Sequence, residues 1–144
     1  MPVDFESTSL SNALGECGFD FGARTFCSWL GVTYYLTDEA IDRTLEIVRR
    51  LPRGSEIVFE YAIPPELLSR EQQEQIAADE AELMGIKEPV LSRFTPAEVE
   101  GKLQWVGFSK AIDFSTEDAQ VRYFQGRRDG LSADLSFHLM RAIV

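Results

Sequence analysis

Four short runs of apolar and β-favouring residues recur along the chain, and segments with helical periodicity separate them. The runs cover residues 25–31, 55–61, 108–114 and 137–144. Strands that alternate with helices are typical of an α/β protein. The chain has 144 residues, which suits a single core. We therefore predict one α/β domain over residues 1–144, with a mixed sheet in a three-layer arrangement.

Capping residues mark where the connecting helices begin and end. The best-marked helix starts at Thr95, because Glu98 completes a capping box with it, and it stops at Gly107. Thr37 similarly starts a helix. The helices expected besides the one from Thr95 are at about residues 8–17, 38–50, 64–84 and 117–125.

The first apolar run, residues 25–32, alternates little between polar and apolar side chains. Strands with such a pattern are usually covered on both faces, as in the middle of a parallel sheet. By this pattern, the run is an inner strand.

The charge balance restricts the classes of partner. The chain carries 24 acidic and 14 basic side chains, which gives a net charge of −10. A surface of this sign repels nucleic-acid phosphates and anionic lipid. Since no apolar run reaches the roughly 20 residues that span a bilayer, we expect a cytoplasmic protein without a membrane or nucleic-acid role.

The residues that most often bind metals or cofactors are sparse. Cys17 and Cys27 match no zinc or redox spacing and are expected to be packed thiols. His138, the only histidine, lies in the last predicted strand, where a core or edge position is expected. No metal site is predicted. The closely spaced glycines near the front follow a helix, not a strand, so we do not interpret them as a cofactor loop.

Four ordered segments resemble one enzyme family. They are Pro2-Val3-Asp4-Phe5-Glu6, then Gly18-Phe19-Asp20 with residues 29–37, then residues 54–61, and finally residues 122–127 with Asp129-Gly130-Leu131. Together they resemble the family of leucine carboxyl methyltransferases and of O-methyltransferases linked to polyketide biosynthesis. The resemblance covers essentially the whole chain.

The resemblance implies a partial Rossmann-like sheet flanked by helices. The family has seven strands in the order 3-2-1-4-5-7-6, with the last strand antiparallel. Mapped onto this chain, residues 1–5 would end strand three, and the four apolar runs would form the part with order 4-5-7-6. The chain would then be the C-terminal half of the fold, lacking the glycine-rich half that holds the methionine end of S-adenosylmethionine.

The resemblance also implies cofactor contacts with S-adenosylmethionine. Asp4 would accept a hydrogen bond from the adenine amino group, and the Phe5 backbone N–H would meet a ring nitrogen. Trp29 and Gly31 would line the pocket. The chain departs from the family at Leu30, where many members carry glutamate. For Asp4, a solvated or capping role is the alternative interpretation, and Trp29 could instead belong to the core.

Residues around the methyl acceptor are suggested in the same way, namely Tyr34, Tyr35, Arg122, Tyr123 and Arg127. Packing or surface ion pairs are the alternative interpretation for these side chains. No catalytic residue is predicted. The implied function is S-adenosylmethionine-dependent methylation of a small-molecule hydroxyl or carboxylate. The alternative is a non-catalytic fragment or assembly module that does not bind the cofactor alone.

Loss of strands one and two would expose one edge of the strand at residues 25–31. This segment contains no proline and no lysine, the residues that commonly protect edge strands. We therefore expect a homodimer or larger assembly in which strand 25–31, or segment 1–6 from a second copy, covers this edge.

Overall fold

The computed structural model describes residues 3–6, 9–85, 89–133 and 136–144, and the side chains of all of these except 79–85. Its core is a four-stranded mixed sheet in the order β1-β2-β4-β3. The strands are β1 (Phe26–Trp29), β2 (Glu56–Ala62), β3 (Lys110–Phe114) and β4 (Phe137–Ile143). Strand β1 runs parallel to β2, and β4 is antiparallel to both of its neighbours. The predicted order and strand directions are confirmed.

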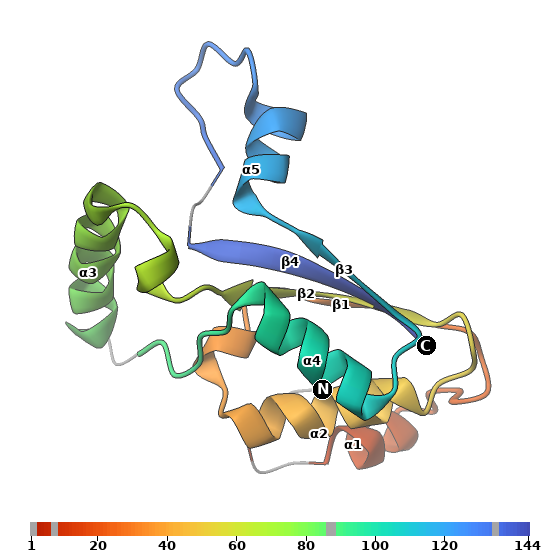
Figure 1. Cartoon of the computed structure of the whole chain (residues 1–144). Coiled ribbons are helices and arrows are strands. Elements are labelled where there is room, and N and C mark those ends of the chain that lie inside the picture. The colour runs from red at the N-terminus through yellow and green to blue at the C-terminus, as the bar shows by residue number, and fades with distance from the viewer. Residues whose placement is uncertain (1–2, 7–8, 86–88, 134–135) are drawn as a thin grey trace.

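Three helices lie on one side of the sheet in Figure 1: α1 (Leu10–Glu16), α2 (Asp38–Arg49) and α4 (Pro96–Val106). Strand β2 shows why this side holds the core. Ile57, Phe59 and Tyr61 are almost fully buried, whereas Val58 and Glu60, which point to the other face, are only half-buried. The apolar stripe of α2 and the side chains of Val99 and Leu103 on α4 complete this core.

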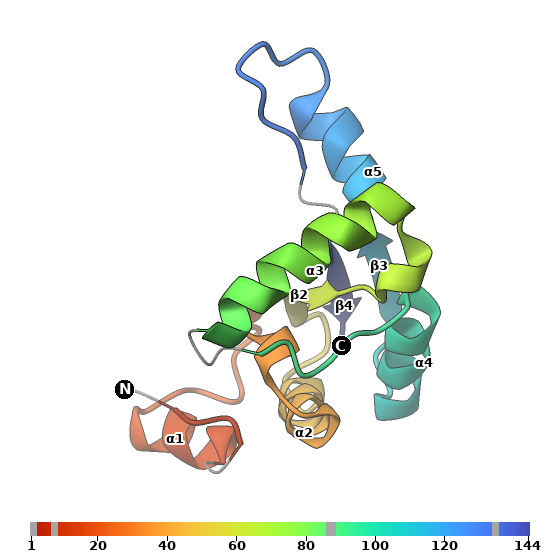
Figure 2. The same cartoon turned by 90° about the vertical axis from the view of Figure 1, so that its left-hand side faces the viewer.

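The prediction of three layers was wrong for the described residues. On the face of the sheet opposite α2, the ion pair between Glu56 and Arg141 remains accessible to solvent, with 2.7 Å between Oε2 and Nε. The remaining elements lie toward one end of the sheet: α3 (Arg70–Gly85), and above it α5 (Thr116–Ala119) with the following π-helical turn η3 (Gln120–Phe124) (Figures 1 and 2).

The first strand differs from the inner position that its local pattern predicted and agrees with the edge position that the family's strand order implied. Strand β1 lies at the edge of the sheet and pairs only with β2. Its burial is uneven, since Phe26 remains 63% exposed while Trp29 is 7% exposed. The described residues 3–6 form no strand, so the mapping of residues 1–5 onto a strand end was wrong for this part.

One helix boundary was misplaced. The helix expected from residue 64 is a short 3-10 turn, η2 (Pro65–Leu67), followed by α3, which begins only at Arg70. Ser69 and Gln72 explain this start, because the Ser69 hydroxyl accepts from the Gln72 N–H and the Gln72 side chain accepts from the Ser69 N–H. This reciprocal capping box lies four residues beyond Pro65, the residue on which the expectation rested.

The capping box of α4 is formed as predicted. The Thr95 hydroxyl accepts from the Glu98 N–H at 3.2 Å, the Glu98 carboxylate accepts from the Thr95 N–H at 2.7 Å, and Gly107 ends the helix with φ of 99°. We expect Thr95→Ala to lower the free energy of unfolding by about 1 kcal/mol, because it orphans a helix N–H. Urea denaturation measures this, and Thr95→Ser, which keeps the hydroxyl, should lose much less.

Candidate functional site

The carboxyl ends of β1 and β2 form the side of the sheet on which ligands of open α/β folds bind. Trp29 ends β1 there and is 7% exposed. Its indole N–H is buried and has no hydrogen-bond partner among the described residues. Because an unpaired buried donor costs about 1–3 kcal/mol, this N–H is a position where an acceptor from outside the chain could bind.

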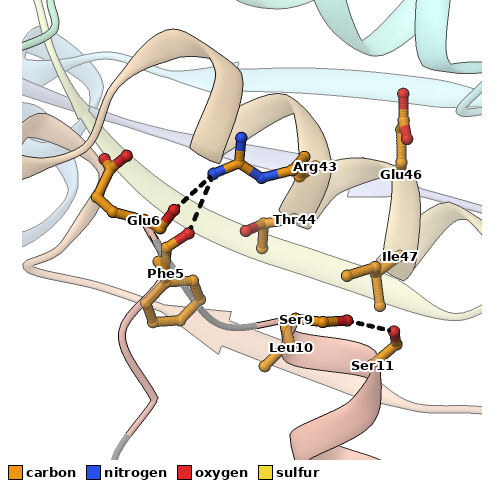
Figure 3. Close-up of a pocket in the computed structure, with 9 residues that line it drawn as sticks. All are labelled: Phe5, Glu6, Ser9, Leu10, Ser11, Arg43, Thr44, Glu46 and Ile47. Atoms are coloured by element: carbon orange, nitrogen blue, oxygen red, sulfur yellow. Dashed lines mark hydrogen bonds between the residues drawn. The ribbon is translucent and has the colours of Figure 1, made fainter.

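The segment with Asp4 and Phe5 is held against this strand end. The Phe5 ring stacks on Trp29, with 5.5 Å between ring centroids. Arg43 on α2 donates to the carbonyl oxygens of Phe5 and Glu6, both at 3.3 Å. Figure 3 shows this contact among the residues that line a cavity of about 340 Å³ between the segment, α1 and α2. Asp4 is exposed, and its carboxylate accepts from the Glu6 N–H at 3.0 Å.

A turn after β1 brings Gly31, Tyr34 and Glu60 together. Gly31 has φ of 72°, and a Cβ atom at this position would lie 4.0 Å from the Tyr34 hydroxyl. The Gly31 N–H donates to the Glu60 carboxylate, with 3.0 Å between N and Oε2. Thr33 ties the turn to the same strand by donating its hydroxyl to the Glu60 carbonyl. Leu30, between Trp29 and Gly31, is 52% exposed.

The five expected acceptor residues fall into two groups. Tyr34 and Tyr35 lie together, with 4.5 Å between their ring centroids. In the segment that extends beyond the sheet in Figure 1, Arg122 lies over Tyr123, while Arg127 pairs with Asp129. The two groups lie on different elements, since Tyr34 and Tyr35 belong to the 3-10 turn Thr33–Tyr35 and Arg122 and Tyr123 belong to η3. The Arg127 pair agrees with the alternative interpretation, a surface ion pair.

Three strands contribute a buried polar network that the sequence did not reveal. The Tyr61 hydroxyl donates to Asp113 Oδ1 at 2.7 Å, and His138 Nδ1 lies 3.0 Å from Asp113 Oδ2. Burial opposes ionisation of Asp113, but the hydrogen bonds from His138 and Tyr61 hold its pKa below the ordinary value. Burial and the Asp113 carboxylate together raise the pKa of Tyr61. His138 is buried, as expected.

The residues of this network had only a weak signal in the sequence. Tyr61 and His138 each point to the same face of the sheet as the buried apolar residues of their own strand. The register places the two residues directly opposite each other. Asp113 lies next to Phe114 in the half-buried strand β3, where nothing in the local pattern marks its carboxylate as part of a network. Only the pairing of β3 with β4 shows that its carboxylate reaches His138. The contact between Glu60 and Gly31 depends in the same way on the pairing of β1 with β2.

Comparison with known proteins agrees with this architecture. The model of the leucine carboxyl methyltransferase family matches residues 1–49. YktD of Bacillus subtilis (strain 168), a proposed S-adenosyl-L-methionine-dependent methyltransferase, is 31% identical over 144 residues. This chain is similar to S-adenosylmethionine-dependent methyltransferases. The match covers 99% of the chain and 47% of YktD, so the chain spans about half the length of this methyltransferase relative.

Solved structures share the fold of this chain. A DUF574 family protein from Streptomyces avermitilis superposes with a TM-score of 0.64 at 17% identity, over 99% of this chain and 53% of that one. Human N-acetylserotonin methyltransferase, solved with S-adenosylmethionine, gives a TM-score of 0.54 at 13% identity, over 99% of this chain and 32% of that one. The fold expected from the resemblance is therefore confirmed.

The residues present fit only one side of S-adenosylmethionine. The Phe5 ring stacks on Trp29, whose N–H is unpaired, and the exposed Asp4 carboxylate next to the Phe5 backbone suits an adenine edge. A glycine-rich turn between a strand and a helix would be needed for the remainder of the cofactor, and the turns after the described strands contain no more than the single Gly31. Among the described residues no cluster of three His, Cys, Asp or Glu side chains could hold a metal ion. No described helix is long and apolar enough to cross a membrane.

Proposed function

We propose that this chain is the acceptor-side, C-terminal half of an S-adenosylmethionine-dependent O-methyltransferase. The observation that carries the proposal is the cluster at the carboxyl ends of β1 and β2. There, the Phe5 ring stacks on Trp29, whose buried N–H is unpaired, and the turn after β1 brings Gly31 close to the Tyr34 hydroxyl. The acceptor would be a small-molecule hydroxyl or carboxylate, including polyketide-type phenols, and the protein would act in the cytoplasm.

Within this proposal, Glu60 takes the role of the glutamate that many family members carry at the position of Leu30. One carboxylate oxygen of Glu60 holds the Gly31 N–H, so the carboxylate is oriented toward the turn. A fixed carboxylate is a strong acceptor for an ammonium or hydroxyl group of a ligand. Tyr34 and Tyr35 would contact the acceptor. Arg122, Tyr123 and Arg127 would reach it only if the segment beyond the sheet folded back.

The alternative function is a non-catalytic fragment or assembly module. The one-sided fit to S-adenosylmethionine favours it, since the turns after the described strands are not glycine-rich and so do not suit the rest of the cofactor. Isothermal titration of S-adenosylmethionine into the 144-residue chain tests this alternative. Micromolar binding by the chain alone would exclude the fragment interpretation.

The proposed function is tested with a chimera in which this chain replaces the matching part of YktD. We expect the chimera to bind S-adenosylmethionine at micromolar concentration, because YktD supplies the remaining half. Asp4→Ala and Glu60→Gln should each weaken binding by roughly tenfold, the loss of one charge-assisted hydrogen bond. Trp105→Ala, on an exposed part of α4, is the matched control and should leave binding unchanged.

Methyl transfer by the chimera is followed as release of S-adenosylhomocysteine with a panel of phenols and carboxylic acids. A folded chimera that binds no cofactor while intact YktD does so would overturn the proposed function. Binding without turnover on any acceptor would support a binding module over an enzyme.

A further inference from the structure

A groove of about 410 Å³ lies between α2 and α4, and exposed or half-buried side chains of both helices line it. Both helices lie on the same side of the sheet (Figures 1 and 2). Helix α4 also contacts β3, the edge strand opposite to β1. In the strand order that the resemblance implies, the preceding strands join the sheet at β1, so they lie at the edge farther from α4.

Trp105 is the most exposed large apolar side chain of this groove, with 90% of its surface accessible. Glu98, Gly101 and Lys102 precede it at helical spacing, so the four residues share one face of α4. An indole that is open to solvent adds little to the core, whereas tryptophan is among the residues on which binding at interfaces most often depends. A partner therefore explains Trp105 better than the fold of this chain does.

Gly101 leaves the groove open one helical turn before Trp105. A Cβ atom at this position would meet no described atom within 4 Å, and the residue lies inside a helix, whose backbone does not need glycine. Apart from proline, glycine is the least favourable residue in a helix interior. Since neither the backbone nor a described neighbour requires glycine here, the missing side chain favours the close approach of a group from outside the chain.

The groove is acidic. Three carboxylates, those of Asp38, Asp42 and Glu98, line it together with the single ammonium group of Lys102. Lys102 Nζ lies 2.6 Å from Asp38 Oδ1, 2.8 Å from Asp42 Oδ1 and 5.4 Å from the centre of the Phe94 ring. One positive charge balances only one of the three carboxylates, so the groove attracts cations and repels phosphates and anionic lipid.

Arginine suits both the open indole and this charge. Its guanidinium group is planar, stacks on the face of an indole, pairs with carboxylates and is less strongly hydrated than the ammonium group of lysine. The carboxylates are spread over two helices, which suits several basic residues of one polypeptide better than a single small cation. A second copy of this chain, with its net charge of −10, is repelled.

We propose that the groove between α2 and α4 binds a basic, arginine-containing segment of a partner protein. One guanidinium group stacks on Trp105, and the stem of the same side chain lies over Gly101. This docking goes beyond the proposed methyltransferase function and requires no cofactor, so either proposal can fail without the other.

Isothermal titration of a blocked peptide in which arginine alternates with glycine into the 144-residue chain tests the proposal. We expect a dissociation constant of about 100 μM or less at low salt, which rises as salt is added. The same peptide with lysine in place of arginine should bind at least about threefold more weakly, because it lacks the planar group. The peptide with citrulline, which is planar but uncharged, should bind at least about tenfold more weakly.

Two variants test which surface binds the peptide. Trp105→Ala should weaken binding about tenfold, because it removes the stacking surface. Gly101→Gln fills the opening and should weaken binding at least about fivefold, whereas the urea midpoint should not fall, because glutamine is the better helix former. A merely structural role of Gly101 would not separate these two readouts. Gln104→Ala, on an exposed part of α4 outside the groove, is the matched control and should leave binding unchanged.

Absence of binding at millimolar concentrations of the arginine peptide overturns the proposal. Binding that both variants leave unchanged, or that the lysine peptide matches, also overturns it, because general attraction to an acidic surface would then explain the result. A dimer in light scattering that Trp105→Ala dissociates would assign the groove to a second copy of the chain instead.

Discussion

Asp113→Ala is expected to lower the free energy of unfolding by about 3 kcal/mol. The substitution removes the acceptor for the Tyr61 hydroxyl and the partner of His138 in one step. Tyr61 is 1% exposed and His138 is 9% exposed, so water cannot readily replace the lost carboxylate. Urea denaturation at neutral pH measures the loss.

Two further variants separate the contributions to this network. Asp113→Asn keeps an acceptor for Tyr61 and an amide group facing His138, so it should cost about 1 kcal/mol. Tyr61→Phe removes only the hydroxyl and should cost a similar amount. If Asp113→Ala proved no more harmful than Asp113→Asn, the network would contribute little to stability.

The same carboxylate predicts a pH dependence. The folded-state pKa of Asp113 lies below its unfolded value, so the unfolded chain binds the proton more tightly. The stabilisation is therefore complete above the unfolded pKa of about 3.9 and is lost as the pH falls through the folded pKa. Between about pH 5 and pH 2, the unmodified chain should lose more stability than Asp113→Asn. Parallel acid titrations of the two proteins would contradict this assignment.

Leu103→Ala is expected to lower the free energy of unfolding by about 3 kcal/mol, within the range for buried leucines. Leu103 on α4 is 0% exposed and packs in the core between this helix, α2 and the sheet. The substitution leaves a cavity that a helix fixed at its capped end cannot readily collapse. Thermal and urea denaturation both measure this loss.

Trp105 supplies the matched control on the same helix, because it is 90% exposed. Trp105→Ala should change stability by less than about 0.5 kcal/mol, although it removes the larger side chain. If the two substitutions had equal effects, α4 would present a different face to the core.

Local signals in the sequence were sufficient for most elements. Thr95 and Glu98 marked α4, and Thr37 marked α2, because capping involves only residues within one helical turn. The strand order and directions came from the family resemblance rather than from local pattern. The start of α3 was missed because the capping box of Ser69 and Gln72 competes with a proline that also suits a helix start.

Contacts between strands could not be derived from local pattern. The local pattern of residues 25–31 predicted an inner strand, whereas the edge position of β1 followed from the strand order of the family. Asp113 and His138 are 25 residues apart in the sequence, and their pairing depends on the register between β3 and β4. The contact between Glu60 and Gly31 likewise spans 29 residues.

The sequence by itself thus determined the helices, the strands and the charge of this protein, because caps, periodicity and composition act over a few residues. Only the tertiary structure decided which side chains meet at the carboxyl ends of β1 and β2 and which polar groups are buried together. Those outcomes depend on strand register, which fixes the neighbours of every side chain across the sheet and is set by the packing of the whole core.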